Sequence, residues 1–208
     1  MIRITEVSIY NFENALRGAR NPMNSWHRGD SYYDETGKYI LGENDLGLAI
    51  KLCKAGSDHR KFMRQIMVSV DILAPLYWWK EFDTYKVGTT ANSTSTMHKI
   101  HSKPFELDDF SHDHLSESGK EALTNMISVL ESTREKFNTS KDKIEWYSMV
   151  QLLPSGYNQL RTCTMSYENL CNMYHARKAH KLLEWREFSN WVATLPYACE
   201  LICGDKQA

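Results

Sequence analysis

The chain has 208 residues, of which 42% are hydrophobic and 25% are charged, and its formal net charge is −1. This length supports one hydrophobic core, so we predict a single domain over residues 1–208. The near-neutral charge, without a basic block, argues against nucleic acid as a partner, whereas a small anionic ligand needs only a few placed cations.

Neither a membrane segment nor a leader is predicted. No apolar run approaches the roughly 20 residues of a membrane-spanning helix, and the initial segment MIRITEVSIYNF lacks the apolar region of a signal peptide. The five cysteines are odd in number and show no Cys-x-x-Cys spacing, which is typical of reduced thiols. We therefore expect a cytoplasmic protein.

The first part of the chain predicts two strands and one helix. Residues 2–10 alternate loosely between apolar and polar side chains and predict a strand, whereas residues 18–42, rich in Gly, Asn, Asp and Tyr, predict a loop. Asn44 is the predicted N-cap of a helix that ends at Gly56. Residues 66–72 are apolar at every second position and predict a strand with one buried face.

The middle of the chain predicts one helix and two loops. Pro75 is expected in the first turn of a helix with the sequence LYWWKEFDTY. Residues 88–96 are mostly Thr and Ser and are too polar for a core element, so we predict a binding loop. Residues 101–118, rich in His and Asp, predict a second loop. Its His-Asp-His triplet at 112–114 has ligand residue types but lacks the further elements of common metal sites, so no metal is predicted.

The last part of the chain predicts three helical regions. An apolar stripe at helical spacing predicts the first, and consists of Leu123, Met126, Ile127, Leu130 and Phe137. The second, with Ile144, Tyr147 and Val150 or Gln151 at helical spacing, stops near Pro154. The third runs from residue 166 to residue 194, with Ser166 as its N-cap. Helices and a small antiparallel sheet together predict the α+β class.

Ordered blocks of the sequence resemble one known family. Residues 92–98, NSTSTMH, match the Asn and Ser of the pattern Asn-x-x-Ser-x-Arg-Tyr, and Leu153-Pro154 is followed at suitable spacing by Arg177. Residues 180–184 supply a His and a Glu after that arginine, and residues 56–59 form a Gly-to-His segment before the second strand. In this order the blocks resemble the flavin-dependent thymidylate synthases, the ThyX family.

The sequence departs from the family pattern at two ligand-binding places. Counting back from Ser95 places Tyr85-Lys86-Val87 where the family has an Arg-His-Arg triplet. Lys86 is therefore the only cation among these three residues. Met97 replaces the family arginine that helps to bind the nucleotide phosphate, and a thioether cannot form that ion pair. The candidate replacement cations are Lys80, Lys86, His98, Lys99 and Arg161.

The resemblance implies a ThyX-like homotetramer with FAD and dUMP sites between subunits, and a reaction at C5 of a deoxyuridine nucleotide. Methylenetetrahydrofolate would be the one-carbon donor, and NADPH would be a further co-substrate. The catalytic residues that it implies are Arg177 and Ser95. The substrate-binding residues that it implies are Asn92, Ser95, His98, Arg161 and Arg177. The cofactor-binding residues that it implies are His59, Tyr85, Lys86 and His180.

Spacing gives these residues a second explanation. Arg177, His180 and Glu184 would share one face of the predicted helix 166–194, because they are three and four residues apart. Surface rows and ladders of ion pairs are the commoner explanation of such triplets. Turn formation likewise accounts for Asn92 and Ser95 without any ligand.

Three functional hypotheses therefore stay open. The first is an FAD-dependent methyltransferase that resembles thymidylate synthase. The second is a flavin-free relative that modifies a pyrimidine nucleotide, and the missing triplet together with Met97 motivates it. The third is a non-catalytic protein that keeps the fold. Retention of flavin and turnover of a nucleotide separate the three.

Overall fold

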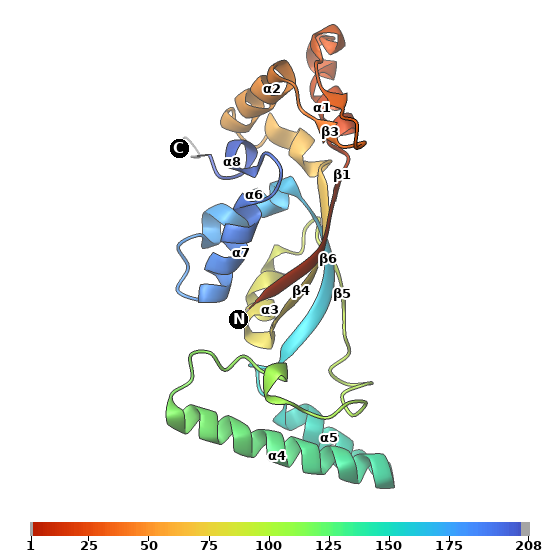
Figure 1. Ribbon diagram of the computed structural model, residues 1–208, viewed down its shortest axis with the longest axis vertical. Coiled ribbons are helices and arrows are strands. Elements are labelled where there is room, and N and C mark those ends of the chain that lie inside the picture. The colour runs from red at the N-terminus through yellow and green to blue at the C-terminus, as the bar shows by residue number, and fades with distance from the viewer. Residues whose placement is uncertain (1, 205–208) are drawn as a thin grey trace. The chain divides into compact units, whose positions relative to one another are not determined.

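The computed structural model describes residues 2–204 (Figure 1). The strands are β1 (Arg3–Tyr10), β2 (Tyr32–Tyr33), β3 (Tyr39–Ile40), β4 (Met67–Pro75), β5 (Thr90–Ser93) and β6 (Asn158–Ser166). The α-helices are α1 (Phe12–Ala19), α2 (Glu43–Lys54), α3 (Leu76–Phe82), α4 (Glu117–Ser140), α5 (Lys143–Leu152), α6 (Tyr167–Arg177), α7 (Leu183–Ala193) and α8 (Ala198–Leu201). The short 3₁₀ helices are η1 (Asn21–Met23), η2 (Trp26–Arg28), η3 (Arg60–Arg64), η4 (Asp83–Tyr85) and η5 (Leu107–Asp109). No helix within residues 2–204 is long and apolar enough to cross a membrane.

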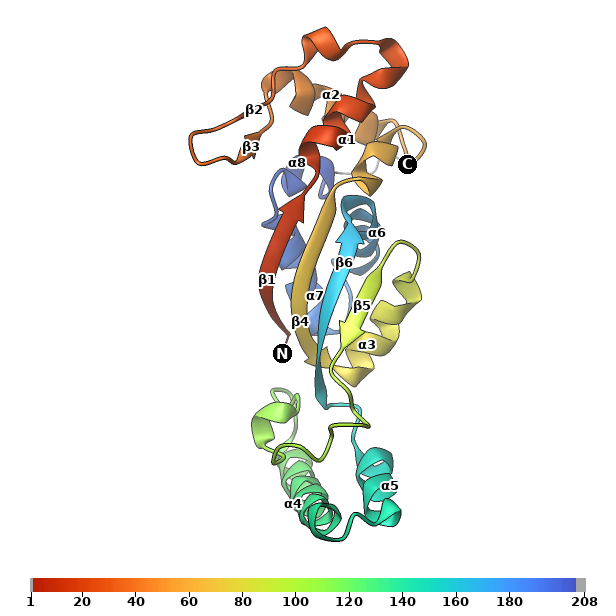
Figure 2. The same cartoon turned by 90° about the vertical axis from the view of Figure 1, so that its right-hand side faces the viewer.

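The main sheet is antiparallel and has the strand order β1-β4-β6-β5 (Figure 2). Two side-chain hydrogen bonds record the register of β4 against β6. Ser69 and Thr164 are joined at 3.0 Å, and the Thr162 hydroxyl donates to Asp71 at 2.6 Å. The residue number rises along β4 as it falls along β6, as antiparallel pairing requires. The predicted α+β class and the predicted strands at 2–10 and 66–72 are confirmed.

Strand β6 was not predicted from the sequence, because its polar residues obscure the alternation of a strand. Gln159 is only 6% exposed, and its side-chain amide donates to the carbonyl of Thr94 at 2.7 Å. Arg161 on the same strand is paired with Asp83 at 2.7 Å. Because partners distant in sequence satisfy these groups, the strand can bury polar side chains that a local pattern would place in solvent.

The chain forms two compact units, which share the strands of the main sheet. Unit 1 contains residues 2–4, 71–84 and 92–162, and unit 2 contains residues 5–70, 85–91 and 163–204. Strands β1, β4, β5 and β6 contribute residues to both units. The single domain over residues 1–208 stays a prediction.

Unit 1 has a core between α4, α5 and the loop before α4. The buried residues of this core are Ile100, Phe105, Phe110, Leu130 and Met149. The predicted stripe on α4 packs here and is confirmed. The predicted face of α5 is wrong, since Ile144 is 71% exposed and Tyr147 is 54% exposed. Trp146 and Met149 face the core instead.

Helix α3, also in unit 1, is anchored by its aromatic side chains. Pro75 is the N-cap of α3, one residue before the first turn in which it was predicted. Trp78, Trp79 and Phe82 are buried, and the indole N–H of Trp79 donates to the carbonyl of Gln159 at 2.9 Å. These rings therefore attach α3 to β6 by packing and by one hydrogen bond.

Unit 2 is built on the alternation of β4. Val68 and Val70 are buried together with Cys163 and Met165 of β6, and helices α6 and α7 cover this face of the strands (Figure 1). Ser166 caps α6 as predicted: its hydroxyl accepts the N–H of Asn169, whose side chain in turn accepts the N–H of Ser166. This capping box fixes the direction in which α6 leaves β6.

Several predicted boundaries are wrong. Helix α2 is capped by Gly42 rather than by Asn44, which lies in the first turn and donates its backbone N–H to Asp30. The predicted helix 166–194 is two helices, because α6 ends at Arg177 and α7 begins at Leu183. The predicted loop 88–96 contains strand β5, whose residues are all exposed. Helix α1 was not predicted.

The two edges of the main sheet differ. At one edge, β5 is only four residues long. At the other edge, Glu6 of β1 is exposed and has a φ of 52°, a left-handed conformation that non-glycine residues seldom adopt. The regular pattern of β1 is therefore interrupted near its middle.

A buried carboxylate joins the first loop to α2 in unit 2. Asp45 is 4% exposed and accepts hydrogen bonds from Arg20 Nε at 2.6 Å and from the hydroxyl and N–H of Ser31 at 2.6 and 3.1 Å. Burial by itself raises the pKa of Asp45, but the bonds from Ser31 and Arg20 outweigh burial and hold that pKa below its ordinary value.

Replacement of this carboxylate, Asp45→Asn, is expected to reduce the free energy of unfolding by about 2–4 kcal/mol at pH 7, since it leaves the buried Arg20 without its counter-charge. A lowered pKa stabilises the folded protein above the ordinary carboxyl pKa, and this contribution is lost as the pH falls through the folded-state value. The variant should therefore lose less stability than wild type between about pH 5 and about pH 2. Urea unfolding across this range measures the difference, with the exposed Asp58→Asn as control. Parallel pH profiles for wild type and D45N would contradict the prediction.

Candidate functional site

Arg177, the last residue of α6, is held by two aromatic side chains. Its Nε donates to the hydroxyl of Tyr85 at 2.9 Å. The guanidinium carbon lies 5.0 Å from the ring centroid of Trp185 and 5.6 Å from that of Tyr85. Such contacts orient the planar guanidinium and favour its positive charge. We call Tyr85, Arg177, His180 and Trp185, all of unit 2, the arginine–aromatic cluster.

His180 joins this cluster from the turn between α6 and α7. Its N–H donates to the Arg177 carbonyl at 2.9 Å, and its own carbonyl accepts Arg186 Nε at 2.7 Å. The imidazole Nδ1 accepts the N–H of Leu182 at 3.2 Å, which leaves the proton of a neutral ring on Nε2. The imidazole meets the buried Trp185 edge-on, with the centroids 6.4 Å apart. Arg177 and His180 thus converge on one ring although they do not share a helix.

Residues 85–89 form a turn that positions Tyr85. The carbonyl of Val87 accepts the side-chain amide of Asn169 at 2.6 Å, which attaches the turn to the first turn of α6. Gly88 has a φ of +74°, and a Cβ there would lie 3.2 Å from that amide, so the position favours glycine. Lys86 is exposed, whereas the Thr89 hydroxyl oxygen is buried and has no hydrogen-bond partner among residues 2–204.

Ser95 borders a cavity of about 590 Å³ in unit 1. The charged residues that line it are Arg3, Lys99, Lys103, Asp108 and Asp109. Lys103 forms an ion pair with Asp109. The Ser95 hydroxyl accepts the N–H groups of Met97 and His98 at 3.2 and 2.8 Å, so it closes a turn at the rim of the cavity. Asp109 compensates the charge of Lys103 and Asp108 adds a further carboxylate, so an anion in this cavity, which we call the Ser95 cavity, would have to pair with Lys99 and Arg3.

Arg161 does not line the Ser95 cavity. Its guanidinium lies 4.3 Å from the ring centroid of Trp79 and is ion-paired with Asp83 at 2.7 Å, while Nε donates to the Gln159 side chain at 3.0 Å. Because Asp83 compensates its charge, a phosphate would have to displace that carboxylate to bind Arg161.

The other predicted site residues are exposed. Asn92 lies on β5 and His98 follows the Ser95 turn, and neither lines the Ser95 cavity. His59 directly precedes η3 in unit 2. Its neighbour Arg60 forms a buried two-bond ion pair with Glu168 of α6, at 2.8 and 3.0 Å. Within residues 2–204, no group of three or more His, Cys, Asp or Glu residues is arranged to hold a metal ion.

Comparison with solved structures identifies the fold. The chain superposes on thymidylate synthase X (ThyX) from Helicobacter pylori, solved with FAD and dUMP, with a TM-score of 0.70 and 14% identity over 97% of each chain. A second structure of flavin-dependent ThyX from the same organism, complexed with FAD and dUMP, gives 0.68 and 16% over 98% of this chain and 100% of that one.

A third similar structure is the UMP/dUMP methylase PolB from Streptomyces cacaoi bound with 5-Br dUMP, with a TM-score of 0.67 and 11% identity over 100% of this chain and 97% of that one. No family model matches the sequence, and no curated protein matches it. The predicted ThyX-like fold is thus confirmed over the whole described chain, whereas the identities are too low to carry residue roles across.

The structure brings together part of the predicted site. Tyr85, Arg177 and His180 meet in the arginine–aromatic cluster, and Trp185 completes it. Trp185 was not predicted as a site residue, since its contact with Arg177 depends on the break between α6 and α7. Glu184, predicted on the same face as Arg177, is buried in α7 instead.

The Tyr85–Arg177 hydrogen bond gives a direct test of the cluster. Tyr85→Phe keeps the ring but removes the acceptor of a charged donor, so we expect the free energy of unfolding to fall by about 1–2 kcal/mol. Urea unfolding followed by tryptophan fluorescence measures this change, and Tyr32→Phe, at an exposed tyrosine of β2, is the matched control. Equal stability of Y85F and Y32F would show that the bond contributes nothing.

Proposed function

We propose that this protein is a ThyX-like enzyme that methylates C5 of a deoxyuridine nucleotide, with methylenetetrahydrofolate as the one-carbon donor, in the cytoplasm and as a homotetramer. The observation that carries this proposal is the arginine–aromatic cluster, which combines a fixed guanidinium with two aromatic rings. It occurs in a fold whose H. pylori examples were solved with FAD and dUMP. The PolB structure, solved with 5-Br dUMP, supports the same class of ligand.

Arg177 is the proposed catalytic residue. A pyrimidine ring reacts at C5 when negative charge develops on its carbonyl edge, and a guanidinium fork donates two parallel hydrogen bonds to such an edge. Tyr85 and Trp185 hold the fork in one plane, so little reorganisation is needed as this charge develops. His180 keeps its place beside Trp185 and is proposed to bind the cofactor.

The Ser95 cavity is proposed to receive the nucleotide phosphate. Lys99 supplies positive charge that Met97 cannot, and the Ser95 turn supplies a hydroxyl at the rim. Asn92 precedes Ser95 by three residues and His98 follows it by three, and both side chains are exposed. We propose that they contact the nucleotide as well. Arg161 would bind the phosphate only if the phosphate displaced Asp83 from its ion pair with this arginine.

The residues around Tyr85 fit an anionic aromatic cofactor. Lys86 is an exposed cation, Thr89 has a buried hydroxyl without a partner among the described residues, and Tyr85 and Trp185 present aromatic rings. We propose that Tyr85, Lys86 and His180, with His59, hold FAD. Bound FAD would supply the hydride that completes the methyl group, with NADPH as the source of electrons.

A flavin-free relative acting on the same nucleotide is the second candidate. The Arg-His-Arg triplet of the family is absent, and Met97 is 46% exposed where the family has an arginine. The first change removes positive charge where the family triplet contacts FAD, and the second removes it where the family arginine helps to bind the nucleotide phosphate. The same two changes also support a third candidate, a non-catalytic protein that keeps the fold. For such a protein we expect no turnover of any nucleotide.

Flavin binding separates the first candidate from the others. The purified protein, incubated with excess FAD and then desalted, is expected to retain the absorbance of bound flavin, and Lys86→Ala should weaken binding about tenfold because it removes the only cation of the turn. A colourless protein that still binds dUMP would favour the flavin-free candidate. A protein that binds neither FAD nor dUMP would favour the non-catalytic candidate.

Nucleotide binding tests the role assigned to Arg177. Arg177→Lys keeps the charge but loses the fork, so we expect dUMP affinity to fall about tenfold or more in isothermal titration calorimetry. The exposed Arg64→Ala is the control and should bind like wild type. If R177K binds dUMP as tightly as R64A, Arg177 does not contact the pyrimidine.

A further inference from the structure

A further cavity of unit 2, of about 730 Å³, lies along α1. Its volume falls within the range of about 300–1,000 Å³ that is common for small-molecule sites. None of its described lining residues belongs to the arginine–aromatic cluster, to the Ser95 cavity or to the other residues proposed to bind the nucleotide or FAD. The lining side chains that the structure describes are four amides, one guanidinium and one indole: Asn11, Asn14, Asn21, Gln65, Arg17 and Trp26.

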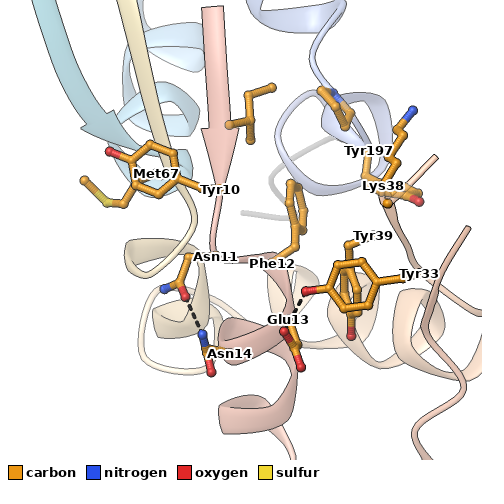
Figure 3. A pocket seen from close by; sticks show the side chains of 13 residues that line it. Tyr10, Asn11, Phe12, Glu13, Asn14, Tyr33, Lys38, Tyr39, Met67 and Tyr197 are labelled. Atoms are coloured by element: carbon orange, nitrogen blue, oxygen red, sulfur yellow. Dashed lines mark hydrogen bonds between the residues drawn. The ribbon is translucent and has the colours of Figure 1, made fainter.

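The amides along α1 hold one another in position. Arg17 Nη2 donates to Asn14 Oδ1 at 2.8 Å, and Asn14 Nδ2 donates to Asn11 Oδ1 at 2.8 Å. Asn11 Nδ2 in turn donates to the backbone carbonyl of Gln65 at 2.8 Å. Figure 3 shows the bond between Asn11 and Asn14, which also line a neighbouring cavity of about 570 Å³. Among residues 2–204 these bonds use one N–H of each asparagine amide, so the second N–H of each can donate to a ligand.

Trp26 supplies an aromatic ring to the lining. It is 52% exposed, and its indole N–H donates to Asn21 Oδ1 at 2.8 Å. The N–H is the polar group of the indole, so the exposed remainder of the ring is an apolar surface bordered by amides. Such a surface favours a ligand that has a C–H face as well as hydroxyl groups.

The loop that carries Trp26 is held by a buried arginine. Arg20 is 5% exposed, and its guanidinium donates to the carbonyls of Ser25 and Arg28 at 3.4 and 3.1 Å. The ion pair of Arg20 with Asp45 fixes this guanidinium in turn. Because carbonyls on both sides of Trp26 are bound, the ring is in place before a ligand arrives, which lowers the entropic cost of binding.

The lining combines little charge with many hydrogen-bonding groups. Among residues 2–204, Arg17 is the only charged residue that lines the cavity, and it already donates to Asn14. A Cβ on Gly18 would lie 3.4 Å from Gln65 Oε1, so the missing side chain leaves room for that amide. An anionic ligand would find one cation here, and a fused aromatic ligand would find one ring to pack on. A neutral ligand with several hydroxyl groups matches the lining better.

We propose that this cavity binds a neutral saccharide made of pyranose units. Each sugar hydroxyl both donates and accepts hydrogen bonds, and a side-chain amide offers an N–H and a C=O that can meet two adjacent hydroxyls. The C–H face of the pyranose packs on the indole of Trp26. Such a ligand has neither a phosphate nor an aromatic base, which distinguishes it from nucleotide, folate and flavin. The site is therefore independent of the proposed methyl transfer in its residues and in its ligand chemistry.

Nuclear magnetic resonance of the isotope-labelled whole protein tests the proposal with maltose and diacetylchitobiose as probes. The indole N–H signal of Trp26 is identified by its loss in Trp26→Phe. We expect at least one probe to shift this signal with a Kd below about 10 mM, and equally at low and high salt because the probes are uncharged. Asn14→Ala should weaken binding about fivefold or more, since it removes one amide and the partner of Asn11. Asn125→Ala, at an exposed asparagine of α4, is the matched control and should bind like wild type.

The outcomes are distinct. Binding of either disaccharide supports the site, and a preference between the two identifies the kind of pyranose unit. An unshifted Trp26 signal with both probes, or equal affinities of N14A and N125A, overturns it. Displacement of a bound probe by dUMP or FAD also overturns it, because the probe would then occupy the site of the proposed reaction. Failure of dUMP or FAD to bind leaves the saccharide titration unchanged, so the two proposals fail separately.

Discussion

The pairing of β4 with β6 determines where two helices of this protein begin. Strand β4 leads into α3 at Leu76, whose N–H donates to the carbonyl of Tyr157 at 3.0 Å. Strand β6 leads into α6 at Tyr167, whose N–H donates to the carbonyl of Ile66 at 2.9 Å. A slip of one residue would turn the buried valines of β4 outward and would move both helix starts. The positions of Tyr85 after α3 and of Arg177 at the end of α6 both follow from this register.

Elements with a clear local pattern could be predicted from the sequence. The alternation of residues 66–72 and the apolar stripe of α4 reflect burial against one partner surface, which spacing alone reveals. Strand β6 could not be predicted, because Gln159 is buried through bonds to residues far away in the chain. The break after Arg177 contains neither Gly nor Pro, so no residue type marks it.

The candidate site was predictable only in part for a similar reason. The resemblance to the ThyX family singled out Tyr85, Arg177 and His180, but their contacts form between residues as much as 92 positions apart. Which cations are available also depends on tertiary partners: Arg161 is compensated by Asp83, whereas Lys99 lines the Ser95 cavity. A count of charges in the sequence cannot distinguish a paired arginine from an accessible lysine, since pairing is a property of the folded chain.

The interruption of β1 at Glu6 has a consequence for the protein in concentrated solution. An edge strand exposes backbone N–H and C=O groups that can pair with a strand of another molecule, and long regular edges promote aggregation. The left-handed backbone conformation and the negative charge of Glu6 limit such pairing along β1. At the opposite edge, the shortness of β5 limits it. A protein with these edges can keep a large exposed strand area and still resist strand-to-strand association with its own copies.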